Sequence, residues 1–315
     1  MINESPWPKL TTSRSSAVLP DLEEDDICGS GFAIIAYTVS DEIGGDAALA
    51  QFRERLAQRD MKLMLDFVPN HTAPDPDYYV QGSEEQIGFA PQNYLRVETD
   101  RGQRILAHGR DPNYPGWPDT LQLNYANPEL QKSQIDELIA IAGKCDGVRC
   151  DMAMLVLPEV FQRTWGVAPE AFWPKATAAV RRAHPAFTFM AEVYWDLEWT
   201  LQQQGFDYCY DKRLYDRLQS IDVREHLRAG LDYQDKLARF LENHDEPRRP
   251  GDRKVIAAAA RCFGHWNVDA AQGWLPCEIR IARNFPVLTT RSLLPPCHEN
   301  RHTEPERWAM RYFHV

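Results

Sequence analysis

The sequence predicts an α/β fold in which helices cover a parallel sheet, as in a (β/α)8 TIM barrel. Segments with helical periodicity alternate with short, almost continuously apolar segments, which is the pattern of buried parallel strands. Polar and charged residues follow the ends of several of these strands, where (β/α)8 barrels place their active sites. A doubly wound sheet would bind a ligand at the same edge, but no glycine-rich phosphate-binding loop supports one.

The length and composition fit one globular domain that is large enough for a barrel. The chain has 315 residues, of which 43% are hydrophobic and 26% are charged. The net charge of −11 argues against nucleic acid and anionic membranes as partners. The first residues lack the features of a signal peptide, no apolar run reaches the length of a membrane span, and the seven cysteines form no CxxC pair. We therefore expect a cytoplasmic protein with reduced thiols.

Helices and strands alternate from about residue 46 onward. An amphipathic helix over 46–59 leads into a buried strand over 61–68. Asn127 and Pro128 form a helix start, Gly143 ends that helix, and a strand follows at 146–150. The alternation continues with a helix at 170–183, a strand at 187–193, a helix at 197–204, a strand at 206–210, helices at 213–219 and 223–229, and a strand at 237–242.

The two ends of the chain do not fit a complete barrel. Residues 1–31 are irregular and contain no apolar strand, whereas 32–251 form the catalytic barrel with a loop-rich insert at 72–124. Residues 252–315 carry 9 Lys+Arg against 6 Asp+Glu and show neither helical nor strand periodicity. We expect the first strands and the last strand to be missing or degenerate, and the tail to be atypical and poorly ordered. A truncated chain with an out-of-frame or unrelated tail is one hypothesis for this pattern.

Three carboxylates, Asp151, Glu192 and Asp245, follow three separate strands. Arg149 shares a strand face with Asp151, so it should favour the ionised form of that carboxylate. Glu192 follows an apolar strand, and burial would raise its pKa and keep it protonated. Glycoside hydrolysis uses such a pair of one ionised and one protonated carboxyl. A single carboxylate here would more often be a helix cap or an ion-pair partner, but three at equivalent strand ends favour a common site.

Four stretches of the chain resemble, in order, the four signature regions of the alpha-amylase family, glycoside hydrolase family 13. They are Asp66–His71, Gly147–Asp151, Ala191–Val193 and Phe240–Asp245. The resemblance covers about residues 29–249 and implies that the regions end the third, fourth, fifth and seventh strands of a barrel. It also implies that the long insert after residue 71 corresponds to the loop domain that the family carries after its third strand.

The resemblance implies a retaining α-glycosidase of carbohydrate metabolism that acts on an α-glucan or an oligosaccharide. Asp151 would be the nucleophile, and Glu192 would be the general acid and then the general base. Asp245 would bind sugar hydroxyls and stabilise the transition state, and Arg149 would orient Asp151. These three carboxylates are therefore the expected catalytic residues.

Further residues are expected to bind the sugar. The resemblance places His71 and His244 in the cleavage subsite, and it places Phe32 where the family usually has a sugar-stacking tyrosine, although a core position is an equally good interpretation. Tyr194 and Trp195 follow Glu192 directly and would line the acceptor side, because aromatic rings are common sugar platforms. Trp117 in the insert is a weaker candidate of the same kind.

Two residues of the first signature region are expected to have other roles. Asn70 is often a calcium ligand in the family, so calcium is a possible cofactor, although partner ligands are not evident in this sequence. No other metal or cofactor is expected. Asp66 is expected to be structural.

The sequence leaves three functions open. The first is hydrolysis of an α-glucan, and the second is transglycosylation at the same site with a sugar as the acceptor. The third is a catalytically incompetent barrel fragment, because an incomplete barrel exposes strand edges and apolar surface.

Overall fold

We analysed a computed structural model of the chain. The structure describes residues 34, 36–73, 91–98, 102, 104–220, 230–240, 243, 245, 278–281, 285–288 and 307–310. The expected helix at 223–229 and two of the candidate site residues, Phe32 and His244, lie outside the described residues.

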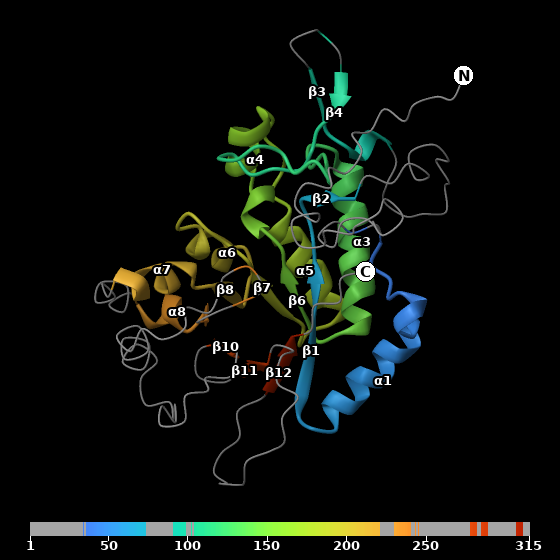
Figure 1. Ribbon diagram of the computed structural model, residues 1–315, viewed down its shortest axis with the longest axis vertical. Helices are drawn as coiled ribbons and strands as arrows, with labels where there is room; N and C mark the ends of the chain where they lie inside the picture. Colours follow the sequence, from blue (N-terminus) through green and yellow to red (C-terminus); the bar gives the residue numbers. More distant parts are fainter. Residues whose placement is uncertain are drawn as a thin grey trace, which may run out of the picture.

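A parallel sheet forms the centre of the molecule (Figure 1). The strands of its β/α repeat pair in parallel and in chain order. They are β1 (Met61–Phe67), β6 (Gly147–Cys150), β7 (Thr188–Ala191), β8 (Tyr208–Tyr210) and β9 (Leu237–Arg239). Each matches a strand expected from the sequence, usually with shorter bounds. This arrangement confirms the prediction of a partial (β/α)8 barrel.

Helices connect these strands, as the β/α alternation predicts. They are α1 (Gly45–Ala57), α3 (Pro128–Lys144), α4 (Pro158–Trp165), α5 (Trp173–Ala183), α6 (Glu198–Gln203), α7 (Lys212–Ser220) and α8 (Leu231–Gln234), with 3-10 turns η2 (Asp41–Ile43), η3 (Pro91–Asn93) and η4 (Ala153–Val156). The side chain of Asn127 caps α3 by accepting from Glu129 N, as expected. Helix α4 was not anticipated from the sequence. None of the described helices combines the length and the apolarity that crossing a membrane requires.

The β/α repeat does not close on itself, because β1 and β9 are not paired with each other. Three short strands from the C-terminal segment lie between them, in the order β12 (Arg307–Met310), β11 (Phe285–Leu288) and β10 (Glu278–Ile281). Strand β10 runs antiparallel to β9 and to β11, unlike the strands of a regular barrel. The sequence shows no strand period here because a four-residue strand is too short to reveal one. The division of the chain at residue 252 stays a prediction.

The insert that follows β1 forms two small antiparallel pairs. Strand β2 (His71–Thr72) pairs with β5 (Leu121–Gln122), and β3 (Arg96–Glu98) pairs with β4 (Arg104–Leu106). Figure 1 shows β2, β3, β4 and α4 beyond the carboxyl end of β1. The insert therefore lies on the side of the sheet where a barrel active site is expected.

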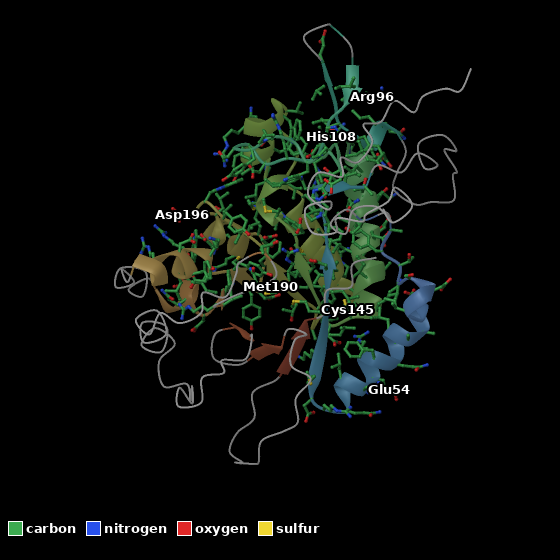
Figure 2. The ribbon with its side chains drawn as sticks, in the orientation of Figure 1. Glu54, Arg96, His108, Cys145, Met190 and Asp196 are labelled. Carbon is green, nitrogen blue, oxygen red and sulfur yellow. The ribbon has the colours of Figure 1, made fainter. Side chains whose placement is uncertain are left out.

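The two faces of the sheet carry different apolar clusters. Val148, Cys150 and Phe189 belong to the larger cluster, which includes buried residues of the helices such as Trp173. On the alternate positions, Met190 belongs to a smaller cluster with Met64, Tyr210, Ala238 and Phe240. Figure 2 shows Met190 over the central part of the sheet and Glu54 on the outer side of α1. We call the face that carries Met190 the inner face. Arg149 on β6 pairs directly with Met190 on β7, so its side chain lies on the inner face as well.

Gly147 allows β6 to lie close to its neighbours. A Cβ atom at this position would lie 2.7 Å from Thr188 O and 3.0 Å from Met64 Cε. We expect Gly147→Ala to lower the free energy of unfolding by about 1–3 kcal/mol, because the strand would have to shift. Gly143→Ala on α3 is a matched control, since its Cβ would contact nothing within 4 Å and alanine favours a helix. Urea unfolding measures both changes, and equal midpoints for the two variants would contradict the close approach.

Candidate active site

The strand register places the candidate catalytic residues next to one another. Arg149 on β6 pairs with Asp66 on β1 and with Met190 on β7, so all three side chains share the inner face. Cys150 pairs with Ala191, and therefore Asp151 and Glu192 follow adjacent strands at neighbouring positions. Because the strands are parallel, their carboxyl ends lie at the same edge of the sheet.

Arg149 joins three carboxyl groups. Its Nη1 donates to Asp151 Oδ1 at 2.8 Å and to Asp66 Oδ1 at 3.0 Å, and its Nη2 donates to Glu192 Oε2 at 2.5 Å. The Arg149 side chain is only 2% exposed, and it lies over the ring of Tyr210 at 5.8 Å. Burial opposes the charge of Arg149, but the carboxylates of Asp66, Glu192 and Asp151 outweigh burial and raise its pKa. One permanent buried cation therefore faces three carboxyl groups.

Hydrogen bonds hold both the carboxyl group and the backbone of Glu192. Its Oε2 accepts from Arg149 and from the backbone N of Met152 at 2.9 Å, and its Oε1 accepts from the hydroxyl of Tyr194 at 2.6 Å. Its backbone N donates to Cys150 O at 3.0 Å. The side chain is 3% exposed, and burial raises its pKa although Arg149 opposes the shift. The direction of this shift is the one that the sequence predicts.

Asp151 lies at the same edge but is more open. Its side chain is 22% exposed, and its backbone N donates to Phe67 O at 2.8 Å. Burial raises the pKa of Asp151, Arg149 opposes this effect, and the charges of Asp66 and Asp245 add to the rise. The sequence correctly predicts the ion pair with Arg149, but it does not reveal that burial outweighs this contact in the pKa of Asp151.

The backbone just beyond these strands adopts an uncommon conformation. Met152 follows Asp151 with φ of 42°, and Trp195 and Asp196 follow Tyr194 with φ of 62° each. Left-handed backbone at non-glycine residues costs free energy and needs support from its surroundings. Asp196 forms an ion pair with Arg213 at 3.0 Å, and Figure 2 shows it beside α6 and away from β1.

His71 lies in β2 and is buried with its ring 5.2 Å from that of Trp117. Burial lowers its pKa to about 4, with Asp119 opposing the shift, so the imidazole is neutral at physiological pH. Asn70 is fully buried, and its Oδ1 accepts from Gln122 Nε2 at 2.9 Å. Among the described residues, no group of three His, Cys, Asp or Glu side chains could hold a metal ion. The calcium role of Asn70 stays a prediction.

The remaining predicted residues are less closely joined to this network. Asp245 is exposed, and its backbone N donates to Asn243 Oδ1 at 2.9 Å, but its charge acts on Asp151. Trp195 is 36% exposed, with Arg163 at 5.4 Å from its ring centroid. Asp66 is more central than expected, because it shares Nη1 of Arg149 with Asp151. In the sequence, Asp66 stands out as a single acidic residue at the otherwise apolar end of a strand, and this could have indicated its role.

Comparison with known protein families and curated proteins identifies relatives of this chain. A sequence model of the alpha amylase catalytic domain matches residues 25–253. Alpha-amylase MalA of Haloarcula japonica is 22% identical over 238 residues, which cover 71% of this chain and 32% of that protein.

Solved structures provide two further comparisons. An alpha-amylase from Lactobacillus plantarum is 27% identical, with 65% of this chain and 48% of that chain covered and a TM-score of 0.46. The native debranching enzyme of Nostoc punctiforme is 18% identical, with 69% and 49% covered and a TM-score of 0.51, which is a likeness in fold. The chain spans about a third of the curated relative and about half of these solved structures.

Arg149→Leu tests the network. Without the cation, buried carboxylates remain uncompensated, and the free energy of unfolding should fall by about 3–5 kcal/mol at pH 7. Asp151 and Glu192 have higher pKa values in the folded chain than in the unfolded chain, where they are about 4. Protonation of these groups therefore stabilises the fold at low pH, and this stabilisation is lost as the pH rises through the folded pKa values. Loss of Arg149 raises both pKa values further, so the variant should be less impaired at pH 5 than at pH 7.

Arg213→Leu is the matched control, because its ion pair with Asp196 is largely exposed. It should cost less than about 1 kcal/mol at either pH. Chemical unfolding at the two pH values measures both variants. An Arg149→Leu effect of the same size at both pH values would contradict the carboxylate network.

Proposed function

The chain belongs to the alpha-amylase family, and on this premise we propose that it hydrolyses α-glycosidic bonds of an α-glucan or oligosaccharide with retention of anomeric configuration. The observation that carries the proposal is that one buried guanidinium joins the two carboxyls that follow adjacent strands, Asp151 and Glu192. A retaining mechanism needs a nucleophile and an acid on the same glycosidic bond.

The unequal exposure of the two carboxyls supports their separate roles. Asp151 is the more open of the two, so its carboxylate can reach the anomeric carbon, and Arg149 opposes the rise that burial causes in its pKa. Glu192 is almost fully buried with a raised pKa, which favours the protonated form that a general acid requires.

The first step transfers the glycosyl group to Asp151. A lone pair of the Asp151 carboxylate attacks the anomeric carbon as the glycosidic C–O bond breaks, and Glu192 gives its proton to the leaving oxygen. The products of this step are a glycosyl ester of Asp151, a free sugar hydroxyl and an ionised Glu192. In the second step, Glu192 takes a proton from water, the water oxygen attacks the anomeric carbon, and the ester bond to Asp151 breaks.

Residues around this pair would bind the sugar. Asp245 acts electrostatically on Asp151, which fits a role with the sugar hydroxyls and the positive charge of the transition state. His71 would hydrogen-bond the sugar as a neutral imidazole beside Trp117. Trp195 presents an exposed ring after β7, which suits stacking on the acceptor side. His244 and Phe32 keep the binding roles expected from the sequence.

Transglycosylation uses the same first step, and only the acceptor of the second step differs. A sugar hydroxyl would replace water, and the choice depends on which of them reaches the glycosyl ester. We propose hydrolysis as the main reaction. Products of maltooligosaccharide conversion distinguish the two, because hydrolysis gives only shorter chains whereas transfer also gives longer ones.

Asp151→Asn and Glu192→Gln test the proposed roles. With a nitrophenyl α-maltoside, we expect turnover by the wild-type chain and a loss of about 10²–10⁴-fold in kcat for Glu192→Gln. Asp151→Asn should lose at least as much, because an amide cannot form the ester. Proton NMR of the first product should show the α anomer.

Glu170→Gln is the matched control, since Glu170 is exposed and its carboxylate forms an ion pair with Lys175. It should retain full turnover. Absence of turnover by a wild-type chain with a cooperative melt, or a β-anomeric product, would contradict the proposal. Absence of turnover together with a non-cooperative melt would instead support the incompetent fragment.

A further inference from the structure

Among the described residues, the donors to Glu192 leave one acceptor position open on its carboxyl group. An ionised carboxylate has two oxygens and about four lone-pair positions. Arg149 Nη2 and Met152 N both donate to Oε2, so that oxygen has no position left. Tyr194 donates to Oε1 and takes one of its two positions. The remaining position, and therefore the transferable proton, belongs to Oε1.

We propose that Tyr194 is a positioning residue for Glu192, whose hydroxyl fixes the rotation of the carboxyl group and directs the open position of Oε1 toward the glycosidic oxygen. This inference rests on the proposed function of Glu192. It differs from the role expected from the sequence, in which the Tyr194 ring lines the acceptor side.

The fold holds Tyr194 in place for this role. Tyr194 lies two residues after Glu192, and its hydroxyl donates to Glu192 Oε1 at 2.6 Å. Its ring is partly buried against the larger apolar cluster, and its carbonyl accepts from Leu197 N at 3.4 Å. Trp195 and Asp196 then turn through the left-handed region. These contacts hold the backbone of Tyr194 and so fix the position of its hydroxyl.

The phenol remains a donor throughout the working pH range. Burial, together with the neighbouring Glu192, raises the pKa of Tyr194 well above its usual value. Its hydrogen bond favours the ionised form of Glu192, as do Arg149 and Met152 N, whereas burial and Asp151 favour the protonated form. Asp245 after β9 also acts on Tyr194, and Asp66 on β1 and Tyr210 on β8 act on Arg149.

Tyr194 would act in both steps. When Glu192 carries its proton on Oε1, the Tyr194 contact keeps that oxygen oriented toward the leaving group. After transfer, Glu192 is an anion with three donors, and its open position on Oε1 is where the attacking water gives up a proton. Loss of the hydroxyl should therefore lower kcat and also move the pH at which the acid form is lost.

Tyr194→Phe keeps the ring and removes only the donor. We expect kcat on a nitrophenyl α-maltoside to fall about 10- to 100-fold, as for loss of a hydrogen bond to a charged group. The alkaline limb of the kcat/KM profile should move to higher pH, because the carboxylate of Glu192 loses stabilisation. Incorporation of 3-fluorotyrosine at position 194 should move the same limb to lower pH, since its hydroxyl is a stronger donor.

Tyr233→Phe is the matched control. Tyr233 is a half-buried tyrosine on α8 whose charged neighbours are Glu198, Asp211 and Arg213 rather than Glu192. It should leave the pH profile unchanged. A Tyr194→Phe profile that coincides with the wild-type profile, with only KM altered, would overturn the positioning role and leave the proposed function standing. Full activity of Glu192→Gln would instead overturn the proposed function itself. If Tyr194→Phe melts below the assay temperature, the 3-fluorotyrosine shift decides.

Discussion

The buried guanidinium of Arg149 is the interaction on which the candidate site depends. It lies on the inner face of β6 and donates to Asp66, Asp151 and Glu192, which come from or follow three adjacent parallel strands. Carboxyl groups this close would repel one another without a cation, and burial would force them to take up protons. The hydrogen bonds of Arg149 therefore allow the three carboxyl groups to lie close together in one site.

Parallel strands make this convergence possible. The register of β1, β6 and β7 brings Asp66, Arg149 and Met190 side by side, and the next residues extend the row to Asp151 and Glu192. Gly147 at the start of β6 allows the close approach of the strands. Helices that cover the outer face fix the sheet through apolar contacts, so the polar residues are confined to the inner face and the strand ends.

Much of this could be predicted from the sequence, because the strongest signals are local. Consecutive residues of the sequence indicate the amphipathic stripe of α1, the Asn127–Pro128 start of α3 and the apolar strands β6 and β7. Other features depend on neighbours that are distant along the chain. The central place of Asp66, the contact of Tyr194 with Glu192 and the effect of burial on Asp151 require the register between strands. Strands β10 to β12 are too short to have a period.

Trapping of the glycosyl ester tests the central claim most directly. A slow 5-fluoro-α-glucosyl fluoride should label the wild-type chain with one glycosyl group, and mass spectrometry of the digested protein should place it on Asp151. Asp151→Asn should not be labelled, whereas Glu170→Gln should be labelled like the wild type. Stoichiometric label on any other residue, or turnover of this reagent to a β-anomeric product without a covalent intermediate, would contradict the account.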